Sequence, residues 1–190
     1  MAAPRIIAGA LRGRVLATPE GLATRPSSAR VRQALFDILA HAPWAKDGGG
    51  QAIAGRTVLD VFAGSGALGL EALSRGAARA SFIESDRAAC QAIRRNIEAC
   101  RAGDRAVLIA ADALAPPRAA MPHDLVLLDP PYGAGLVPRA LESLRASGWV
   151  APGALIAAEF GRTDPLPTDL QLLAERTHGK ALLAIWRWPA

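Results

Sequence analysis

The sequence has no long hydrophobic segment and few cysteines. No apolar run reaches the roughly 18 residues of a membrane-spanning helix, and the N-terminus lacks the charged-then-apolar pattern of a secretion signal. We therefore expect no membrane partner and a cytoplasmic location. The two cysteines, Cys90 and Cys100, fall on one apolar face of a predicted helix. They would lie about 15 Å apart, too far for a disulfide, so we expect them to be buried packing residues.

Several functional motifs are also absent. Neither of the two lysines, Lys46 and Lys180, stands in a G-x-x-x-x-G-K-[ST] motif, which excludes a P-loop ATPase. Ser65 is preceded two positions back by Ala63, so the G-x-S-x-G motif of α/β-hydrolases is not matched. The three histidines are scattered without ligand spacing, so we expect no metal site.

Positive charge is concentrated at the N-terminus. The 190-residue chain has a formal net charge of +5, and residues 1–32 hold six arginines against a single acidic side chain, Glu20. The rest of the chain is therefore electrically balanced. Arginine presents a planar fork of donors that matches phosphate, so this basic segment predicts a nucleic-acid contact, although solvated arginines would look the same. The candidate nucleic-acid-binding residues are Arg5, Arg12, Arg14, Arg25, Arg30 and Arg32.

A glycine-rich turn is predicted near the centre of the chain. Thr57-Val58-Leu59 is typical of a buried strand, and it leads into DVFAGSGALG over residues 60–69. The glycines satisfy G-x-G-x-x-G, which brings backbone and helix N–H groups close to a ligand, although a tightly packed turn can need the same glycines. Glu84 ends the next predicted strand twenty positions after Gly64, where an acidic residue binds ribose hydroxyls. The pattern suits NAD, FAD or S-adenosylmethionine.

A second turn, Asp129-Pro130-Pro131-Tyr132, chooses among these cofactors. It follows the apolar strand predicted over residues 125–128, so it lies where open α/β sheets bind ligands. Asp129 can accept a hydrogen bond from an exocyclic amine, and the stiff turn can present the Pro130 carbonyl as a second acceptor. Tyr132 offers a flat face for a base. We therefore predict methyl transfer from S-adenosylmethionine to a planar amine, with Asp129, Pro130 and Tyr132 as candidate catalytic residues.

The two turns together resemble the amino-methylating class of S-adenosylmethionine-dependent methyltransferases. RIIAG at residues 5–9, RGR at residues 12–14 and RPSSARVRQALF at residues 25–36 narrow the resemblance to the RsmD family, and it covers nearly the whole chain. That family methylates a guanine N2 in small-subunit ribosomal RNA. The resemblance implies a Rossmann-like class I methyltransferase fold, a mostly parallel, doubly wound sheet with one antiparallel strand near the C-terminus. It also implies ribosomal RNA as the partner, within a small-subunit particle.

The resemblance also assigns residues to the cofactor. In similar methyltransferases an acidic residue after the third strand binds the adenine amine, and Asp112 stands there, although a plain loop carboxylate would fit as well. Asp60 and the turn backbone are expected to hold the methionine part. The candidate cofactor-binding residues are Asp60, Phe62, Gly64, Gly66, Glu84, Asp112 and Ala113.

Hydrophobic periodicity divides the chain near residue 50. Residues 1–50 are expected to form a basic arm, a helix and a glycine-rich linker, and residues 51–190 the methyltransferase domain of a monomer. On the first helix, Arg32 and Phe36 lie one turn apart, so both could reach the cofactor or the RNA, although an exposed arginine and a core phenylalanine would fit the same pattern. The expected helices cover residues 29–40, 69–76, 86–100 and 136–146. The expected strands cover residues 57–62, 80–84, 106–110, 124–129, 155–159, 170–176 and 181–188.

Three other functions fit parts of the pattern. A DNA adenine-N6 or cytosine-N4 methyltransferase would share the proline turn, but such enzymes usually carry a sequence-reading domain for which 190 residues leave little room. An NAD-dependent oxidoreductase would share the glycine turn and not the proline turn. A non-catalytic RNA-binding assembly factor could retain the fold, and only turnover separates it from the enzyme.

Overall fold

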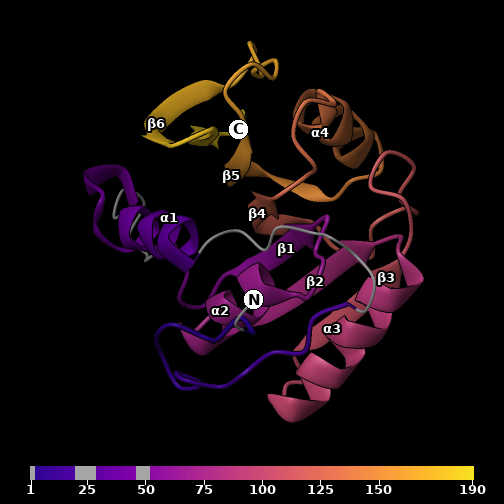
Figure 1. Ribbon diagram of the computed structural model, residues 1–190. Coiled ribbons are helices and arrows are strands. Elements are labelled where there is room, and N and C mark those ends of the chain that lie inside the picture. Colours follow the sequence, from indigo (N-terminus) through magenta and orange to yellow (C-terminus); the bar gives the residue numbers. More distant parts are fainter. Residues whose placement is uncertain (1–2, 20–28, 46–51) are drawn as a thin grey trace.

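The computed structural model describes residues 3–19, 29–45 and 52–190 (Figure 1). Arg25 and the three linker glycines at 48–50 lie outside these residues. The helices are α1 (Ala29–His41), α2 (Ala67–Ser74), α3 (Arg87–Ala99) and α4 (Leu136–Ala146), with a short 3-10 turn η1 (Pro43–Ala45). The strands are β1 (Thr57–Val61), β2 (Arg79–Glu84), β3 (Ala106–Ala110), β4 (His123–Leu128), β5 (Val150–Gly161), β6 (Gln171–His178) and β7 (Ala181–Arg187).

The strands form one seven-stranded sheet in the order β3-β2-β1-β4-β5-β7-β6. Strand β1 pairs in parallel with both β2 and β4, whereas β7 is antiparallel to both β5 and β6. The predicted fold, a mostly parallel doubly wound sheet with an antiparallel strand near the C-terminus, is therefore confirmed. The strand order reverses between β1 and β4, and the crevice at the carboxyl ends of such a pair is where open α/β sheets bind ligands.

The central strands of the sheet are buried on both faces because they are apolar on both sides. Along β4, Leu125 and Leu127 join one hydrophobic cluster, while Val126 and Leu128 join the other. Helices α1, α2 and α3 contribute side chains to the first cluster, and α4 contributes to the second. The layers are visible in Figure 1, with α2 and α3 on one side of the sheet and α4 on the other. Cys90 and Cys100 are buried as predicted.

Residues 3–19, here called the arm, form a small irregular hairpin. An antiparallel bridge joins Arg5 to Val15, and the amide of Gly13 donates to the carbonyl of Ile6 at 2.8 Å. The tip of the hairpin lies on α2 so closely that a Cβ at Gly9 would sit 1.9 Å from the carbonyl oxygen of Ser74. Only glycine fits there, and its φ of +81° also favours glycine. The arm is thus a hairpin that is folded back onto α2.

Among the described helices, none is long and apolar enough to cross a membrane.

Candidate active site

The glycine turn is a sharp bend between β1 and α2. Phe62 has a φ of +58°, which is uncommon for an aromatic residue, and Gly64 and Gly66 have φ values of +57° and +75°. Gly66 is the N-cap of α2. Three left-handed residues within five positions turn the chain from the sheet into the helix, so the end of β1 is left beside the switch point.

The three motif glycines are required for different reasons. A Cβ at Gly69 would lie 2.4 Å from the ring of Phe82, and a Cβ at Gly66 would lie 3.2 Å from the same ring. Both glycines therefore let α2 approach the sheet. At Gly64 the nearest atom to a Cβ would be the carbonyl oxygen of Phe62 at 4.0 Å. Gly64 is thus the position where the backbone is open to a ligand.

Three glycine amides of the turn donate to acceptors within the protein. The N–H of Gly64 donates to Oε2 of Glu84 and that of Gly69 to Oδ2 of Asp60, both at 2.8 Å. The N–H of Gly66 donates to the carbonyl of Ala63 at 2.7 Å. The expectation that these N–H groups point at a ligand is therefore corrected. They stabilise the turn, because a buried N–H without an acceptor would be costly.

Glu84 connects the turn to the end of β2. While Oε2 accepts from Gly64, Oε1 accepts from the amides of Ser85 and Asp86, each at 2.8 Å. Asp86 in turn caps α3 by accepting from the amide of Ala89. Glu84, the residue predicted to bind the ribose, is thus fixed at the carboxyl edge of the sheet. A carboxylate that accepts from three N–H donors has a defined orientation.

Asp60 lies beneath the turn with a solvent exposure of 1%. Its Oδ1 is buried without a hydrogen-bond partner among the described residues. Burial raises the pKa of Asp60 well above its ordinary value, the bond from Gly69 opposes the shift, and the charges of Asp129 and Glu84 add to it. The structure therefore gathers these three carboxylates at one edge of the sheet. An orphaned acceptor among negative charges fits a cationic group.

Asp112 and Ala113 follow β3, at the same edge. Asp112 is exposed, and its Oδ1 accepts from the amide of Leu114 at 2.9 Å, while Ala113 is buried against the α4 side of the sheet. The carboxylate of Asp112 thus stays at the surface next to the strand that carries Glu84. This position is compatible with the role expected for it.

The proline turn follows β4, the neighbour of β1. The amide of Asp129 lies 3.4 Å from the carbonyl of Val61, which ties the start of this turn to the end of β1. The hydroxyl of Tyr132 donates a hydrogen bond to Oε1 of Glu159, a buried carboxylate near the end of β5. Tyr132 is nevertheless 42% exposed. Its hydroxyl is anchored, and the residue remains accessible from the surface.

A further carboxylate fixes the loop after the turn. Oδ2 of Asp164 accepts from the amides of Gly133 and Gly161, at 3.0 and 2.9 Å. The sequence did not single out Glu159 or Asp164, because each bonds a residue about thirty positions away. An acidic residue near the carboxyl end of β5 is a signal that could have indicated Glu159. It has no fixed spacing from the proline turn, so the sequence does not pair it with Tyr132.

Comparison with known proteins identifies the family. The chain matches the family described as "Conserved hypothetical protein 95" over residues 4–187. It is 41% identical to the Ribosomal RNA small subunit methyltransferase D of Escherichia coli K12, covering 86% of this chain and 78% of that protein. The chain belongs to the RsmD family. It is a methyltransferase, as the two turns predicted.

Further comparisons agree with this family. The protein of the same name from Haemophilus influenzae is 36% identical over 92% of this chain and 89% of that protein. A solved structure from Escherichia coli, 38% identical, superposes with a TM-score of 0.80 and covers 100% of this chain and 99% of that chain. An RNA methyltransferase from Salinibacter ruber in complex with S-adenosyl-L-homocysteine shares the fold, with a TM-score of 0.58 at 17% identity over 87% and 94% of the two chains.

The position of Arg32 differs from the expectation that it contacts RNA. Its side chain is only 3% exposed, and its Nη2 donates to the carbonyl of Arg5 at 2.7 Å. Burial lowers the pKa of Arg32, and the carboxylates of Glu71 and Asp129 oppose that shift. A buried guanidinium cannot reach a phosphate directly, so Arg32 is removed from the RNA-binding set. It holds the arm against α1, close to the amine side of the site. Phe36, one turn along, is fully buried in the core.

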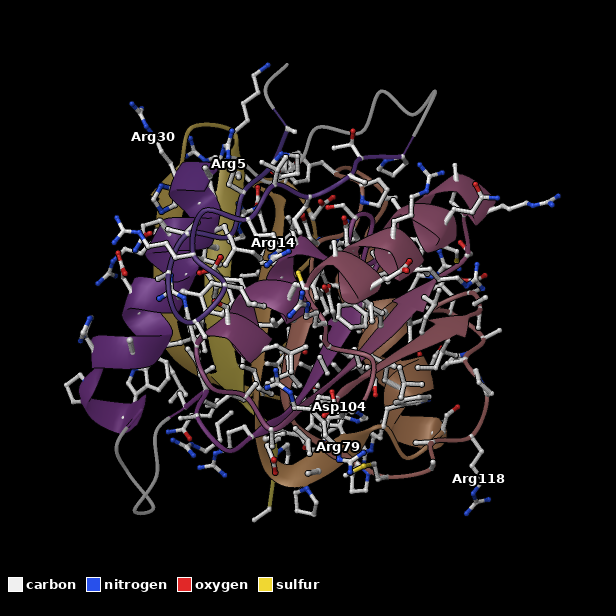
Figure 2. The ribbon with its side chains drawn as sticks, turned by 90° about the horizontal axis from the view of Figure 1, so that it is seen from below. Arg5, Arg14, Arg30, Arg79, Asp104 and Arg118 are labelled. Carbon is white, nitrogen blue, oxygen red and sulfur yellow. The ribbon has the colours of Figure 1, made fainter. Side chains whose placement is uncertain are left out.

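Four of the candidate arginines lie on the surface. Arg5, Arg12, Arg14 and Arg30 are exposed, and Figure 2 shows Arg30 extending from α1 away from the body. Arg5 donates to the carbonyl of Gly13 and Arg14 to that of Ala99. A guanidinium has five N–H donors, so one such bond leaves donors for a phosphate.

Helix α2 holds the arm through side chains that the sequence did not reveal. The buried carboxylate of Glu71 accepts from the amides of Ile7 and Ala8, at 2.7 and 3.0 Å, and pairs with Arg75 at 2.7 Å. The hydroxyl of Ser74 accepts from the amide of Leu11 at 2.9 Å. The arm is thus fixed by its backbone, and its arginine side chains remain outward.

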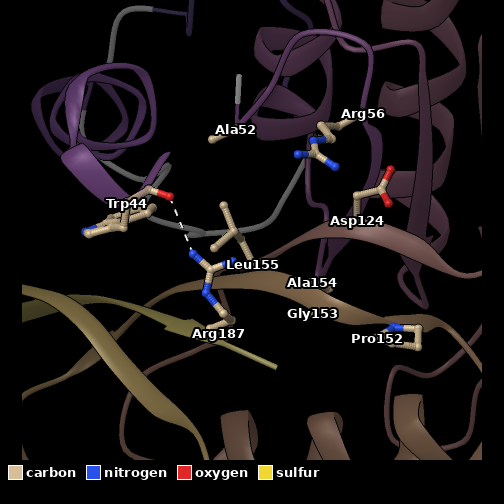
Figure 3. Close-up of a pocket in the computed structure, with 9 residues that line it drawn as sticks. All are labelled: Trp44, Ala52, Arg56, Asp124, Pro152, Gly153, Ala154, Leu155 and Arg187. Carbon is tan, nitrogen blue, oxygen red and sulfur yellow. Dashed lines mark hydrogen bonds between the residues drawn. The ribbon is translucent and has the colours of Figure 1, made fainter. Parts of the chain in front are cut away.

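A small pocket of about 70 Å³ lies at the opposite edge of the sheet (Figure 3). Arg187, one of its linings, donates to the carbonyl of Trp44 at 3.4 Å. Asp124, another, accepts from the amide and hydroxyl of Thr57. The pocket contains no predicted site residue. Among the described residues there is also no cluster of histidine, cysteine or acidic side chains that could hold a metal ion.

Proposed function

We propose that the protein transfers a methyl group from S-adenosylmethionine to the exocyclic N2 of a guanine in small-subunit ribosomal RNA. The observation that carries the proposal is the pairing of the glycine turn after β1 with the proline turn after β4, at the point where the strand order reverses. An adenosine-type site and an amine-binding turn then share one crevice. The relatives' printed name, Ribosomal RNA small subunit methyltransferase D, supports the choice of RNA.

The residues present fit S-adenosylmethionine. The unpartnered Oδ1 of Asp60 is an acceptor for the ammonium group of the methionine part, and the space at Gly64 lets the cofactor approach the backbone. Glu84 would bind the ribose hydroxyls with acceptor capacity beyond its three backbone bonds, and Asp112 the adenine amine. Phe62 and Ala113 would line the site. When bound, the cofactor supplies an electrophilic methyl group.

On the amine side, Asp129 and the Pro130 carbonyl would accept hydrogen bonds from the guanine NH₂. Two acceptors would direct the nitrogen lone pair out of the base plane and stabilise the positive charge that develops as the bond forms. Asp129 can then take the proton, because the methylated amine is acidic while it is charged. Tyr132, anchored on Glu159, would be the surface on which the flipped-out base stacks.

The exposed arginines would bind the phosphate backbone. Arg5, Arg12 and Arg14 lie on the arm, which bonds Ser74 of α2 and Ala99 of α3, and Arg30 lies at the start of α1. Arg25, outside the described residues, remains a candidate. We expect the RNA to be part of a small-subunit particle, the protein to act as a monomer in the cytoplasm, and residues 1–50 to work as the substrate-binding part.

The test is methyl transfer with identification of the product. Labelled S-adenosylmethionine is offered with small-subunit ribosomal RNA, with small-subunit particles that lack the modification, and with duplex DNA of mixed sequence. N2-methylguanosine formed from the ribosomal substrates is the expected result. Methylated adenine or cytosine from the DNA would support the DNA methyltransferase alternative, and binding of RNA without turnover would support an assembly factor.

A further inference from the structure

Asn96, on α3, joins two parts of the molecule that the reaction uses separately. Its side chain is 1% exposed. Its Oδ1 accepts from the amide of Ala17 at 2.7 Å, and its Nδ2 donates to the carbonyl of Ala17 at 3.0 Å. The same Nδ2 donates to the carbonyl of Ser65 at 2.8 Å. Ala17 belongs to the arm, and Ser65 lies between the two glycines of the cofactor turn.

Every polar atom of this amide is used, and each partner is backbone. Such a buried amide has one favourable orientation, because any rotation leaves a donor or an acceptor unsatisfied. A shift of the Ser65 carbonyl therefore changes the bond that the arm shares, and a shift of Ala17 changes the bond to the turn. Sequence reasoning did not indicate this residue, since its partners are 79 and 31 positions away.

We propose that Asn96 is a positioning residue that couples the arm to the cofactor turn, so that S-adenosylmethionine and RNA bind cooperatively. The inference rests on the proposed function for its RNA half. Cofactor binding orders the turn, and through Asn96 it also orders the arm, so that RNA meets an arm that has already lost part of its freedom. By linkage, RNA on the arm raises cofactor affinity by the same factor.

The other arm contacts provide a matched control. The hydroxyl of Ser74 accepts from the amide of Leu11 and donates to the carbonyl of Ala8, and both partners belong to the arm. Ser74→Ala thus weakens the arm's attachment without touching the link. Asn96→Asp breaks the link at the turn while one bond to the arm remains, because an aspartate carboxylate still accepts from the amide of Ala17 but cannot donate to the carbonyls of Ser65 and Ala17.

The first experiment requires no RNA. Amide hydrogen exchange is measured residue by residue, with and without S-adenosylhomocysteine, in the full chain and in the Asn96→Ala, Asn96→Asp and Ser74→Ala variants. The reporter is the amide of Leu16, which is next to Ala17 and has its own bond to the carbonyl of Pro4 at 2.8 Å. We expect S-adenosylhomocysteine to slow its exchange about fivefold, the effect of one hydrogen bond on an equilibrium, in wild type and in Ser74→Ala.

Both Asn96 variants should lose that response, with exchange rates within twofold with and without S-adenosylhomocysteine. Asn96→Asp, which keeps an acceptor for Ala17, should have slower exchange at Leu16 than Asn96→Ala, and it preserves the test if the alanine variant fails to fold. An unchanged response in Asn96→Asp, or no response in wild type, would overturn the inference.

The second experiment measures RNA affinity with and without S-adenosylhomocysteine. A several-fold gain is expected in wild type and none in Asn96→Asp. Equal gains in both proteins would overturn the cooperative part. An RNA affinity that does not depend on the arginines of the arm would instead count against the proposed function. The hydrogen-exchange result at Leu16 would still decide whether Asn96 couples the arm to the turn.

Discussion

The glycine turn follows β1 and the proline turn follows the neighbouring strand β4, but the two turns are stabilised in different ways. Side chains from three other places bond the glycine turn and its helix: Glu84, Asp60 and Asn96. In the proline turn two pyrrolidine rings fix the backbone, and Tyr132 is anchored on Glu159. The cofactor side is therefore a network of hydrogen bonds from side chains to the backbone of the turn. In it a residue such as Glu84 both stabilises the turn and is proposed to bind the cofactor. The amine side is stiff by its covalent structure, so its functional groups can be changed with less effect on the fold.

The largest effect is expected on the amine side. Asp129→Ala should lower methyl transfer at least a hundredfold, about 3 kcal/mol of barrier, because the amine loses an acceptor and its alignment. Its affinity for S-adenosylmethionine should stay within a few-fold. Single-turnover kinetics and a cofactor titration give the two numbers. Near-wild-type turnover would contradict the role of this residue.

On the cofactor side, Glu84→Ala should weaken S-adenosylmethionine binding ten- to a hundredfold, since a hydrogen bond to a charged group contributes roughly 1.5–3 kcal/mol. It should also lower the melting temperature, because the amides of Gly64, Ser85 and Asp86 lose their acceptor. Glu84→Gln, which keeps one acceptor oxygen, is the matched control and should lose less of both. Unchanged affinity in Glu84→Ala would mean that the adenosine lies elsewhere.

Packing beneath the glycine turn predicts a pure stability effect. Gly69→Ala places a Cβ 2.4 Å from the buried ring of Phe82, and such overpacking costs about 1–3 kcal/mol of unfolding free energy. Gly103→Ala is the control, because nothing lies within 4 Å of a Cβ there. Denaturant unfolding of both variants decides. Equal stability of the two would show that the helix is free to move away from the sheet.

The arm's arginines should affect RNA binding through salt. Each phosphate contact contributes about 0.9 to the salt slope on duplex and about 0.7 on single strands, so Arg5, Arg12 and Arg14 changed together to Gln should flatten it by roughly two to three units. Arg118→Gln, an exposed arginine away from the arm, should leave the slope unchanged (Figure 2). Equal salt slopes for the triple variant and wild type would mean that the carboxyl edge of the sheet alone binds the RNA.

A last effect concerns the pH dependence of stability, and it belongs to the cofactor side. The pKa of Asp60 is raised by burial, so the folded state favours its protonated form. That contribution is complete below the ordinary value of 3.8 and is lost as pH rises through the raised pKa. Relative to Asp60→Asn, wild type should therefore lose unfolding free energy as pH rises above about 4. Parallel stability curves for the two proteins would contradict the shift.

Elements and motifs were predictable where the signal is local. The expected helix and strand ends agree with the structure to within a residue or two, because apolar runs stop at glycine, proline or charge. Strand β5 is the exception. The sequence predicts it over residues 155–159, whereas it covers Val150–Gly161 and includes Pro152 and Gly153. The register shift between His123 and Leu125 lets β5 continue along β4 through these residues.

Long-range side-chain partners were not predictable. Helical spacing places Arg32 one turn from Phe36, but only the folded-back arm decides that it is buried, by bringing the carbonyl of Arg5 to it. Glu71 and Asn96 bond backbone amides more than sixty positions away, and a backbone amide has no sequence signature. The predicted site residues rest on strand, turn and glycine spacing, which are encoded within about twenty positions, and their roles stay predictions.

The central claim is that the glycine turn binds the cofactor and the proline turn positions the amine, and it has one direct test. Single-turnover methyl transfer to small-subunit ribosomal RNA is measured at saturating S-adenosylmethionine for Glu84→Ala and Asp129→Ala side by side. The account predicts that Glu84→Ala recovers a rate near that of wild type, while Asp129→Ala stays at least a hundredfold slower. Equal rates in the two variants under saturation would contradict it, since both turns would then serve the same step.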